Sequence, residues 1–304
     1  MTSLDLTDED DQWRLVLELE AVRAAESGQG YWYGAAASQA GRVRGVARLG
    51  GWVSIGRPWD AELAHEVGHN LNLRHTRCGD PPAPDPEFPY ANGGIGVWGY
   101  DFRDGTVLSP DRRRDIMGYC YDQGWLSDYH FEKVIDHRAR VEGLQAAVMA
   151  GAGATSETLV LWGGVVNGEP RIEPPFPMTT TAHLPEEAGP YRLEGIGRDG
   201  EVELSLAFTP GEDQFGNKYF FFTVPIEAEW VGSLNRLTLA GPEGTVTVSA
   251  ANERALSVIT DPATGQIRGI LRDWEDAVPT TLGLTDSFNV RTVRGLGEAV
   301  RLER

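Results

Sequence analysis

Residues 61–75 read AELAHEVGHNLNLRH and contain half of the six histidines of the chain, at positions 65, 69 and 75. Positions four apart share one face of a helix, so His65 and His69 can point their imidazoles at the same ion. Glu66 directly follows the first histidine and brings a carboxylate beside that ion. Three neutral imidazoles with an open fourth position are typical of a catalytic zinc site, whereas structural zinc sites are closed by four protein ligands.

The third histidine requires a break in this helix. His75 lies six residues after His69, too far along to share its helical face. We therefore expect Asn72 to adopt a left-handed backbone conformation and to turn the chain back, because asparagine follows glycine in its tolerance of this conformation. The alternative is an amphipathic helix with solvated histidines, which leaves the spacing of His75 unexplained.

The stretch resembles the metzincin clan of zinc endopeptidases, whose pattern is HExxHxxGxxH followed by a methionine-containing turn. The matching positions are His65, Glu66, His69 and His75. Asn72 stands where the pattern has glycine. Residues 115–120, DIMGYC, resemble the methionine turn, with Met117 as the apolar floor under the zinc. The resemblance covers about residues 10–145 and is nearest in character to secreted bacterial members with a trailing β-domain.

The resemblance implies an α+β metzincin-like catalytic domain over residues 1–150. Its parts are a twisted mixed sheet, a backing helix, the zinc helix, the methionine turn and a C-terminal helix. Apolar residues recur with helical spacing over 8–26, where we expect the backing helix. Residues 45–53 resemble the edge strand that binds the substrate backbone in this clan. A last helix is expected over 127–140, with His130 and His137 on its surface.

The resemblance also implies roles for the site residues. Zinc lowers the pKa of a bound water to near 7, and Glu66 is expected to take a proton from that water and pass it to the leaving amine. Tyr119 occupies the place where some metzincins keep a tyrosine that reaches the zinc or the oxyanion. Packing alone explains a tyrosine at this position equally well.

The two cysteines of the chain each follow one of these motifs. Cys78 lies three residues after the third histidine, and Cys120 lies three residues after Met117. If both motifs converge on one ion, the two sulfurs come close as well, so we expect a disulfide and with it an oxidising compartment. Two buried free thiols are the alternative.

The pattern of the sequence changes after residue 154. Short β-rich runs separated by turn signals occur at 158–165, 191–196, 202–208, 218–224, 236–240, 245–249, 256–259 and 266–271. This density predicts an all-β antiparallel sandwich over 155–304, a domain that binds substrate or a surface partner. Its acidic loop at Glu212 and Asp213 is a site for structural calcium or, alternatively, a solvated turn.

Composition limits the partners and the location. The net charge of −18 argues against a nucleic-acid or anionic-membrane partner. No apolar run approaches the ~20 residues of a membrane span. Residues 1–11 are acidic and lack the apolar core of an export signal. Because we expect an oxidising compartment, we interpret the chain as a mature form or fragment of a secreted protein.

Two other functions remain open at this point. One is a zinc-dependent hydrolase acting on a non-peptide amide, against which the edge strand over residues 45–53 argues, because such a strand is suited to a peptide backbone. The other is a non-catalytic binding module that retains a zinc helix. Glu66 argues against that function, because zinc binding does not need a base. The sequence favours a zinc-dependent metalloendopeptidase acting on protein or peptide substrates.

Overall fold

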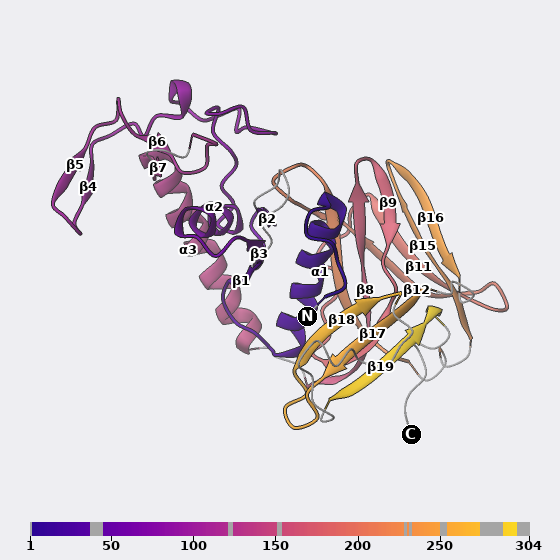
Figure 1. Ribbon diagram of the computed structural model, residues 1–304. Helices are drawn as coiled ribbons and strands as arrows, with labels where there is room; N and C mark the ends of the chain where they lie inside the picture. Colours follow the sequence, from indigo (N-terminus) through magenta and orange to yellow (C-terminus); the bar gives the residue numbers. More distant parts are fainter. Residues whose placement is uncertain are drawn as a thin grey trace. The chain divides into compact units, whose positions relative to one another are not determined.

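The computed structural model describes residues 2–36, 45–120, 124–150, 154–227, 230, 233–249, 254–273 and 288–296, except for the side chains of 60 and 142–150. Contacts divide the chain into two compact units (Figure 1). The histidine unit comprises Gly30–Ala152 and Glu212–Gly216, and the β-rich unit comprises Met1–Gln29, Gly153–Gly211 and Asn217–Arg304. Residues 1–29 and 212–216 thus lie in the opposite unit from the one that the predicted domains, 1–150 and 155–304, assign to them.

A small mixed sheet forms one side of the histidine unit. Its strands are β1 (Trp32–Ala35), β2 (Gly45–Ala47) and β3 (Val53–Gly56), in the order β1-β3-β2. β1 runs parallel to β3, and β2 runs antiparallel to it. β2 therefore lies at an edge of this sheet, as predicted. The edge strand is shorter than the predicted residues 45–53, because the chain turns after β2 and Val53 begins the central strand β3.

The helix that carries the first two histidines is α2 (Asp60–Asn70). It ends where the sequence predicts. Asn72 has a φ of 66°, so the expected left-handed conformation is confirmed. The amides of Asn72 and Leu73 donate to the carbonyls of His69 and Gly68, and these bonds close the helix end. The chain then leaves the helix axis and carries His75 back toward α2.

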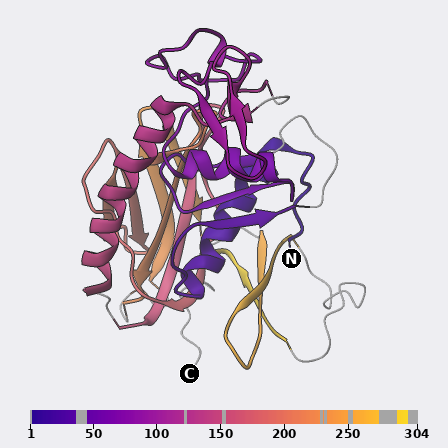
Figure 2. The ribbon, with the colours of Figure 1, turned by 90° about the vertical axis from the view of Figure 1, so that its left-hand side faces the viewer.

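Short elements connect α2 to a long final helix. They are η1 (Ala91–Gly93), β4 (Gly99–Asp101), β5 (Thr106–Leu108), β6 (Arg114–Asp115) and β7 (Gly124–Trp125). α3 (Asp128–Ala150) then runs as one uninterrupted helix (Figure 2). His130 and His137 on this helix are buried, so the prediction that they lie on the surface is wrong. For His130 the reason is a hydrogen bond to the buried carboxylate of Asp115.

The described residues of the β-rich unit form mainly antiparallel sheets, together with the first helix of the chain (Figure 1). One sheet has the order β10-β8-β14-β13, with β9 paired to β8; a second has the order β12-β11-β15-β16; a third has the order β18-β17-β19. The strands are β8 (Ser156–Val166), β9 (Glu169–Ile172), β10 (Phe176–Thr180), β11 (Tyr191–Gly197), β12 (Val202–Phe208), β13 (Gly211–Glu212), β14 (Lys218–Pro225), β15 (Leu234–Gly241), β16 (Gly244–Ser249), β17 (Ala255–Thr260), β18 (Ile267–Arg272) and β19 (Asn289–Arg294).

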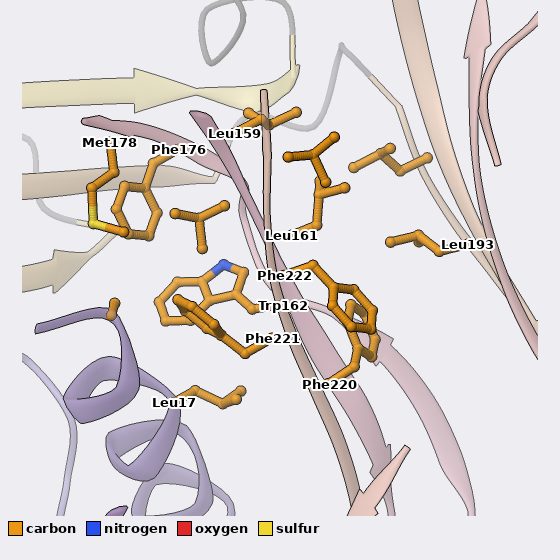
Figure 3. Close-up of a cluster of buried hydrophobic side chains, with 14 of the residues drawn as sticks. Leu17, Leu159, Leu161, Trp162, Phe176, Met178, Leu193, Phe220, Phe221 and Phe222 are labelled. Atoms are coloured by element: carbon orange, nitrogen blue, oxygen red, sulfur yellow. The ribbon is translucent and has the colours of Figure 1, made fainter. Parts of the chain in front are cut away.

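The first helix, α1 (Glu9–Ala25), packs in the β-rich unit. Its apolar stripe of Trp13, Leu17 and Ala21 has the spacing of one helical face and joins the same core as Trp162. Figure 3 shows Leu17 facing this core. The packing of α1 against these strands was not predicted, because the apolar spacing predicts a buried face but does not select the sheet that covers it. Its backing role toward the sheet of the histidine unit stays a prediction.

Ion pairs fix α1 further. Arg272 at the end of β18 contacts both Glu18 of α1 and Glu173. Burial raises the pKa of Glu18 to about 7, and the arginine opposes this shift.

Among the described residues, no helix is both long enough and apolar enough to cross a lipid bilayer.

Candidate metal centre

His65, His69 and His75 come together in the histidine unit. One nitrogen from each ring lies within 4.8 Å of the other two, and all three side chains are buried. The Nε2 atoms of His65 and His69 are 3.1 Å apart. The ring of His75 is edge-on to that of His69, with 4.7 Å between centroids. Within the described part of the chain this is the one cluster of histidine, cysteine and acidic groups with metal-binding geometry.

Backbone carbonyls hold each ring in one orientation. The Nδ1 atoms donate to Ile116 for His65 at 2.8 Å, to Leu73 for His69 at 2.7 Å, and to Pro82 for His75 at 2.8 Å. A proton on Nδ1 leaves Nε2 as the lone-pair donor of each ring. The Nε2 atom of His75 is buried without a hydrogen-bond partner, which is the state of a ligand atom that faces an ion. The donor set therefore fits a metal ion.

The same environment keeps the three rings neutral. Burial lowers the pKa of His65, lowers that of His69 well below its usual value, and lowers that of His75 to about 4. The neighbouring histidines add to the last two shifts. Metal ligation requires the neutral imidazole, so all three rings are in the ligand form at neutral pH.

The turn around Met117 packs against α2, the helix that carries His65 and His69. Met117 is fully buried, and a Cβ added to Gly68 of α2 would overlap its sulfur. The amide of Thr76 donates to the carbonyl of Met117, and the amide of Tyr119 donates to the carbonyl of Cys78. The segment after His75 is thereby paired to the methionine turn, so both motifs meet as predicted.

Asp115 fixes the start of this turn. Its Oδ1 accepts from the amide of Met117 and from Nδ1 of His130, and its Oδ2 accepts from the amide of Ser127. Burial raises the pKa of Asp115, but these hydrogen bonds outweigh it and hold the pKa below its usual value. The carboxylate is thus a buried anion that ties the turn to the first residues of α3.

The predicted disulfide between Cys78 and Cys120 is confirmed, with 5.6 Å between the two Cα atoms. It links the segment after His75 to the end of the methionine turn. In the chain-entropy account, a disulfide of this span contributes about 4 kcal/mol to the free energy of unfolding. The bond therefore strengthens the same junction as the backbone hydrogen bonds of Thr76 and Tyr119.

The side chain of Glu66 projects from α2 and lies beside the edge strand β2. Its side chain is 4% exposed, and a Cβ on Gly45 would overlap its carboxylate. Burial raises the pKa of Glu66 well above its usual value; a hydrogen bond from Gln214 opposes the shift, and the charge of Glu62 adds to it. A carboxylate with a raised pKa is suited to exchange protons near neutral pH. Its catalytic role stays a prediction.

Tyr119 packs against the histidines. Its ring centroid is 5.0 Å from that of His75 and 5.9 Å from that of His65. The tyrosine thus lies at the cluster, where either of its predicted roles is possible, and a catalytic role for it also stays a prediction.

Gln214 is a site residue that was not predicted from the sequence. Its Nε2 atom donates to Oε2 of Glu66 at 3.1 Å, across 148 residues of sequence. The neighbouring acidic pair, considered for calcium or for a solvated turn, is engaged within the histidine unit: Glu212 forms an ion pair with Arg74 at 3.2 Å, and Asp213 is buried. No local motif marks these residues, because their partners are distant in sequence.

Comparison with known proteins supports the chemistry of this region. Residues 34–128 match the family model described as Peptidase M66. A Dictomallein-like protein of Hahella chejuensis (strain KCTC 2396) is 38% identical over 80 residues, which cover 24% of this chain and 12% of that protein. No solved structure matches the chain. The family match contains the three histidines, Glu66 and residues 115–120, and it supports a peptidase function for this part of the chain.

Proposed function

We propose that the chain is a zinc-dependent endopeptidase of metzincin type. The observation that carries this proposal is the convergence of three neutral, oriented imidazoles, with a buried carboxylate of raised pKa on the residue that follows His65. The match of residues 34–128 to a peptidase family supports it. The substrate class follows from the reaction: proteins or peptides that can reach the edge of β2.

Zinc is the ion that the donor set favours. Three histidine nitrogens are one of its usual catalytic ligand sets, and a catalytic site keeps further positions open. When bound, zinc would act as a Lewis acid toward water and toward a peptide carbonyl. His65, His69 and His75 would hold it through Nε2, with the three carbonyl acceptors at Nδ1 keeping the rings in place.

Glu66 is the proposed general base and acid. Its carboxylate accepts a proton from the attacking water and donates it to the amine of the leaving peptide. Its raised pKa brings the protonated and ionised forms closer in free energy, so that both transfers are accessible near neutral pH. Gly45 leaves the space that the carboxylate needs beside β2.

The edge position of β2 favours a peptide over a small amide. An extended substrate can add to an edge strand through main-chain hydrogen bonds. A hydrolase for small non-peptide amides has no need of such an edge. A non-catalytic zinc module has no need of a buried carboxylate at this position. Both alternatives are therefore less well supported than an endopeptidase.

The disulfide between Cys78 and Cys120 supports a location outside the reducing cytoplasm, and we propose that the protein is secreted. For the β-rich unit we propose a binding role toward substrate or a surface partner. This proposal rests on its antiparallel sheets, which carry no cluster of metal-binding groups among their described residues.

The test uses the full chain loaded with zinc and a peptide library derived from whole-proteome digests. We expect one zinc per chain and cleavage that a chelator abolishes. Glu66→Ala should keep the zinc and lose on the order of 10² to 10⁴ in rate. His69→Ala should lose zinc and activity together. A Glu66→Ala variant as active as the wild type would rule out the mechanism.

A further inference from the structure

Residues 212–216, here called the 212–216 segment, run along the outer edge of β2. The inner edge of β2 pairs with β3. On the outer edge, Arg48 forms an antiparallel bridge with Asp213, and the amide of Leu49 donates to the carbonyl of Glu212 at 2.9 Å. This is where a further strand would add to the sheet.

The side-chain carboxamide of Gln214 hydrogen-bonds to two backbone groups at this edge. Its Oε1 accepts from the amide of Ala47 at 2.7 Å, and its Nε2 donates to the carbonyl of Gly45 at 3.1 Å. An added strand would use the same two groups, the amide of residue i+2 and the carbonyl of residue i, for its main-chain hydrogen bonds. The carboxamide of Gln214 thus imitates the backbone of a bound peptide.

The same carboxamide also covers the proposed base. Nε2 of Gln214 lies 3.1 Å from Oε2 of Glu66, so one NH₂ group is shared between the edge strand and the carboxylate. Gln214 is 3% exposed, and the ring of Phe215 lies 6.5 Å from that of His75. The segment therefore extends from the edge strand past Glu66 to the histidines.

The 212–216 segment is anchored by more than this amide. Glu212 forms an ion pair with Arg74, which follows α2. Oδ1 of Asp213 accepts from the amide of Phe215 and shapes the turn that presents Gln214. Both ends of the segment are continuous with strands: Glu212 is the last residue of β13, and β14 begins at Lys218. The segment therefore remains tethered when it leaves the edge.

We propose that the 212–216 segment is an internal substrate mimic that closes the site, and that cleavage of a peptide requires it to leave the edge of β2. This inference rests on the proposed peptidase function. The amide of Ala47 and the carbonyl of Gly45 cannot pair with Gln214 and with a substrate backbone at once. The measured activity is therefore the activity of the open site multiplied by the fraction of molecules in which the segment is displaced.

The first test measures displacement without relying on activity. Amide hydrogen exchange is followed at Leu49, whose acceptor is the carbonyl of Glu212 and not the side chain of Gln214. Gln214→Ala removes the contacts to β2 and Glu66, so exchange at Leu49 should accelerate by about tenfold. Asn217→Ala is the matched control, because the side-chain oxygen of Asn217 accepts from the amide of Asn167. It should leave Leu49 unchanged. Equal exchange in Gln214→Ala and wild type would contradict the mimic.

The second test measures inhibition with the zinc-loaded full chain and the peptide library. Gln214→Ala should cleave about tenfold faster than wild type. A slower Gln214→Ala would contradict the mimic and make Gln214 a positioning residue for Glu66. Cleavage by neither protein would instead contradict the peptidase function, and the exchange at Leu49 would still show whether the segment leaves the edge.

A covalent lock gives the converse experiment. Arg48 and Asp213 are paired across the edge, and both native cysteines are already in a disulfide. Oxidised Arg48→Cys/Asp213→Cys should hold the segment in place and cleave at least about tenfold more slowly than either single variant. If the locked protein is as active as the single variants, the segment does not block the site.

Discussion

Oδ1 of Asp115 accepts a hydrogen bond from Nδ1 of His130 at 2.9 Å, and both side chains are fully enclosed. The same carboxylate receives the amides of Met117 and Ser127. Removing it leaves these buried donors without a partner. We expect Asp115→Ala to lower the free energy of unfolding by about 3 kcal/mol, measured by urea denaturation.

The control for this prediction is Asp101→Ala. Asp101 pairs with the exposed guanidinium of Arg103, so its loss should change stability little. The sign of the pH effect follows from the lowered pKa of Asp115. Its contribution is present above the usual pKa of aspartate and is lost as the pH falls through the lower pKa of the folded protein. Equal effects of the two variants would contradict the role of Asp115.

Gly45 should be required for activity but not for metal binding. A Cβ at this position overlaps the carboxylate of Glu66, and its three nearest neighbours are all atoms of that side chain. We expect Gly45→Ala to lower kcat/KM by on the order of 10², the effect of moving a catalytic group by about 1 Å. Zinc content measured by mass spectrometry should stay at the wild-type value.

Gly124→Ala is the matched control for Gly45→Ala. A Cβ at Gly124 has no neighbour closer than 3.7 Å, so it fits without moving anything. Its kcat/KM should equal that of the wild type. A Gly45→Ala variant with the same kcat/KM would mean that Glu66 has room to move without loss of function.

The left-handed turn at Asn72 should matter more to zinc affinity than to global stability. Asn72→Gly keeps the conformation and should be neutral or mildly stabilising. Asn72→Val should cost roughly 1–2 kcal/mol, because a β-branched side chain crowds the backbone in the left-handed conformation and lacks the polar group with which asparagine bonds locally. Ligands need to be held to within about 0.5 Å, so His75 would be misplaced. Chelator competition on both variants measures this. Equal zinc affinity would show that His75 does not depend on the turn.

Metal-free protein should lose stability in mild acid. Burial lowers the pKa of His75 to about 4. Between about pH 4 and 6.5 this imidazole is therefore protonated in the unfolded chain but neutral in the folded chain. Stability therefore falls as the pH is lowered through this window, by about 3 kcal/mol from this residue. Thermal unfolding at pH 4.5 and pH 7 measures it. His75→Phe should reduce the difference, and an unchanged difference would assign the effect to other groups.

The local motifs were predictable from the sequence, and the long-range contacts were not. The spacing of His65, His69 and His75 predicts their convergence, and Asn72 marks the end of the helix, because both depend on helix geometry alone. The helix at 9–25 was also predictable as an element, but its apolar stripe does not say which sheet covers it. His130 was assigned to the surface because its partner, Asp115, lies outside its helix.

Gln214 follows Glu66 by 148 residues. During synthesis at roughly 5–20 residues per second, the residue that caps the carboxylate leaves the ribosome on the order of 10 s after the carboxylate itself. The nascent chain thus has an interval in which β2 and Glu66 lack the 212–216 segment. The order of translation makes this segment the last part of the histidine unit to be made, so its docking completes the unit only after β12 has been synthesised.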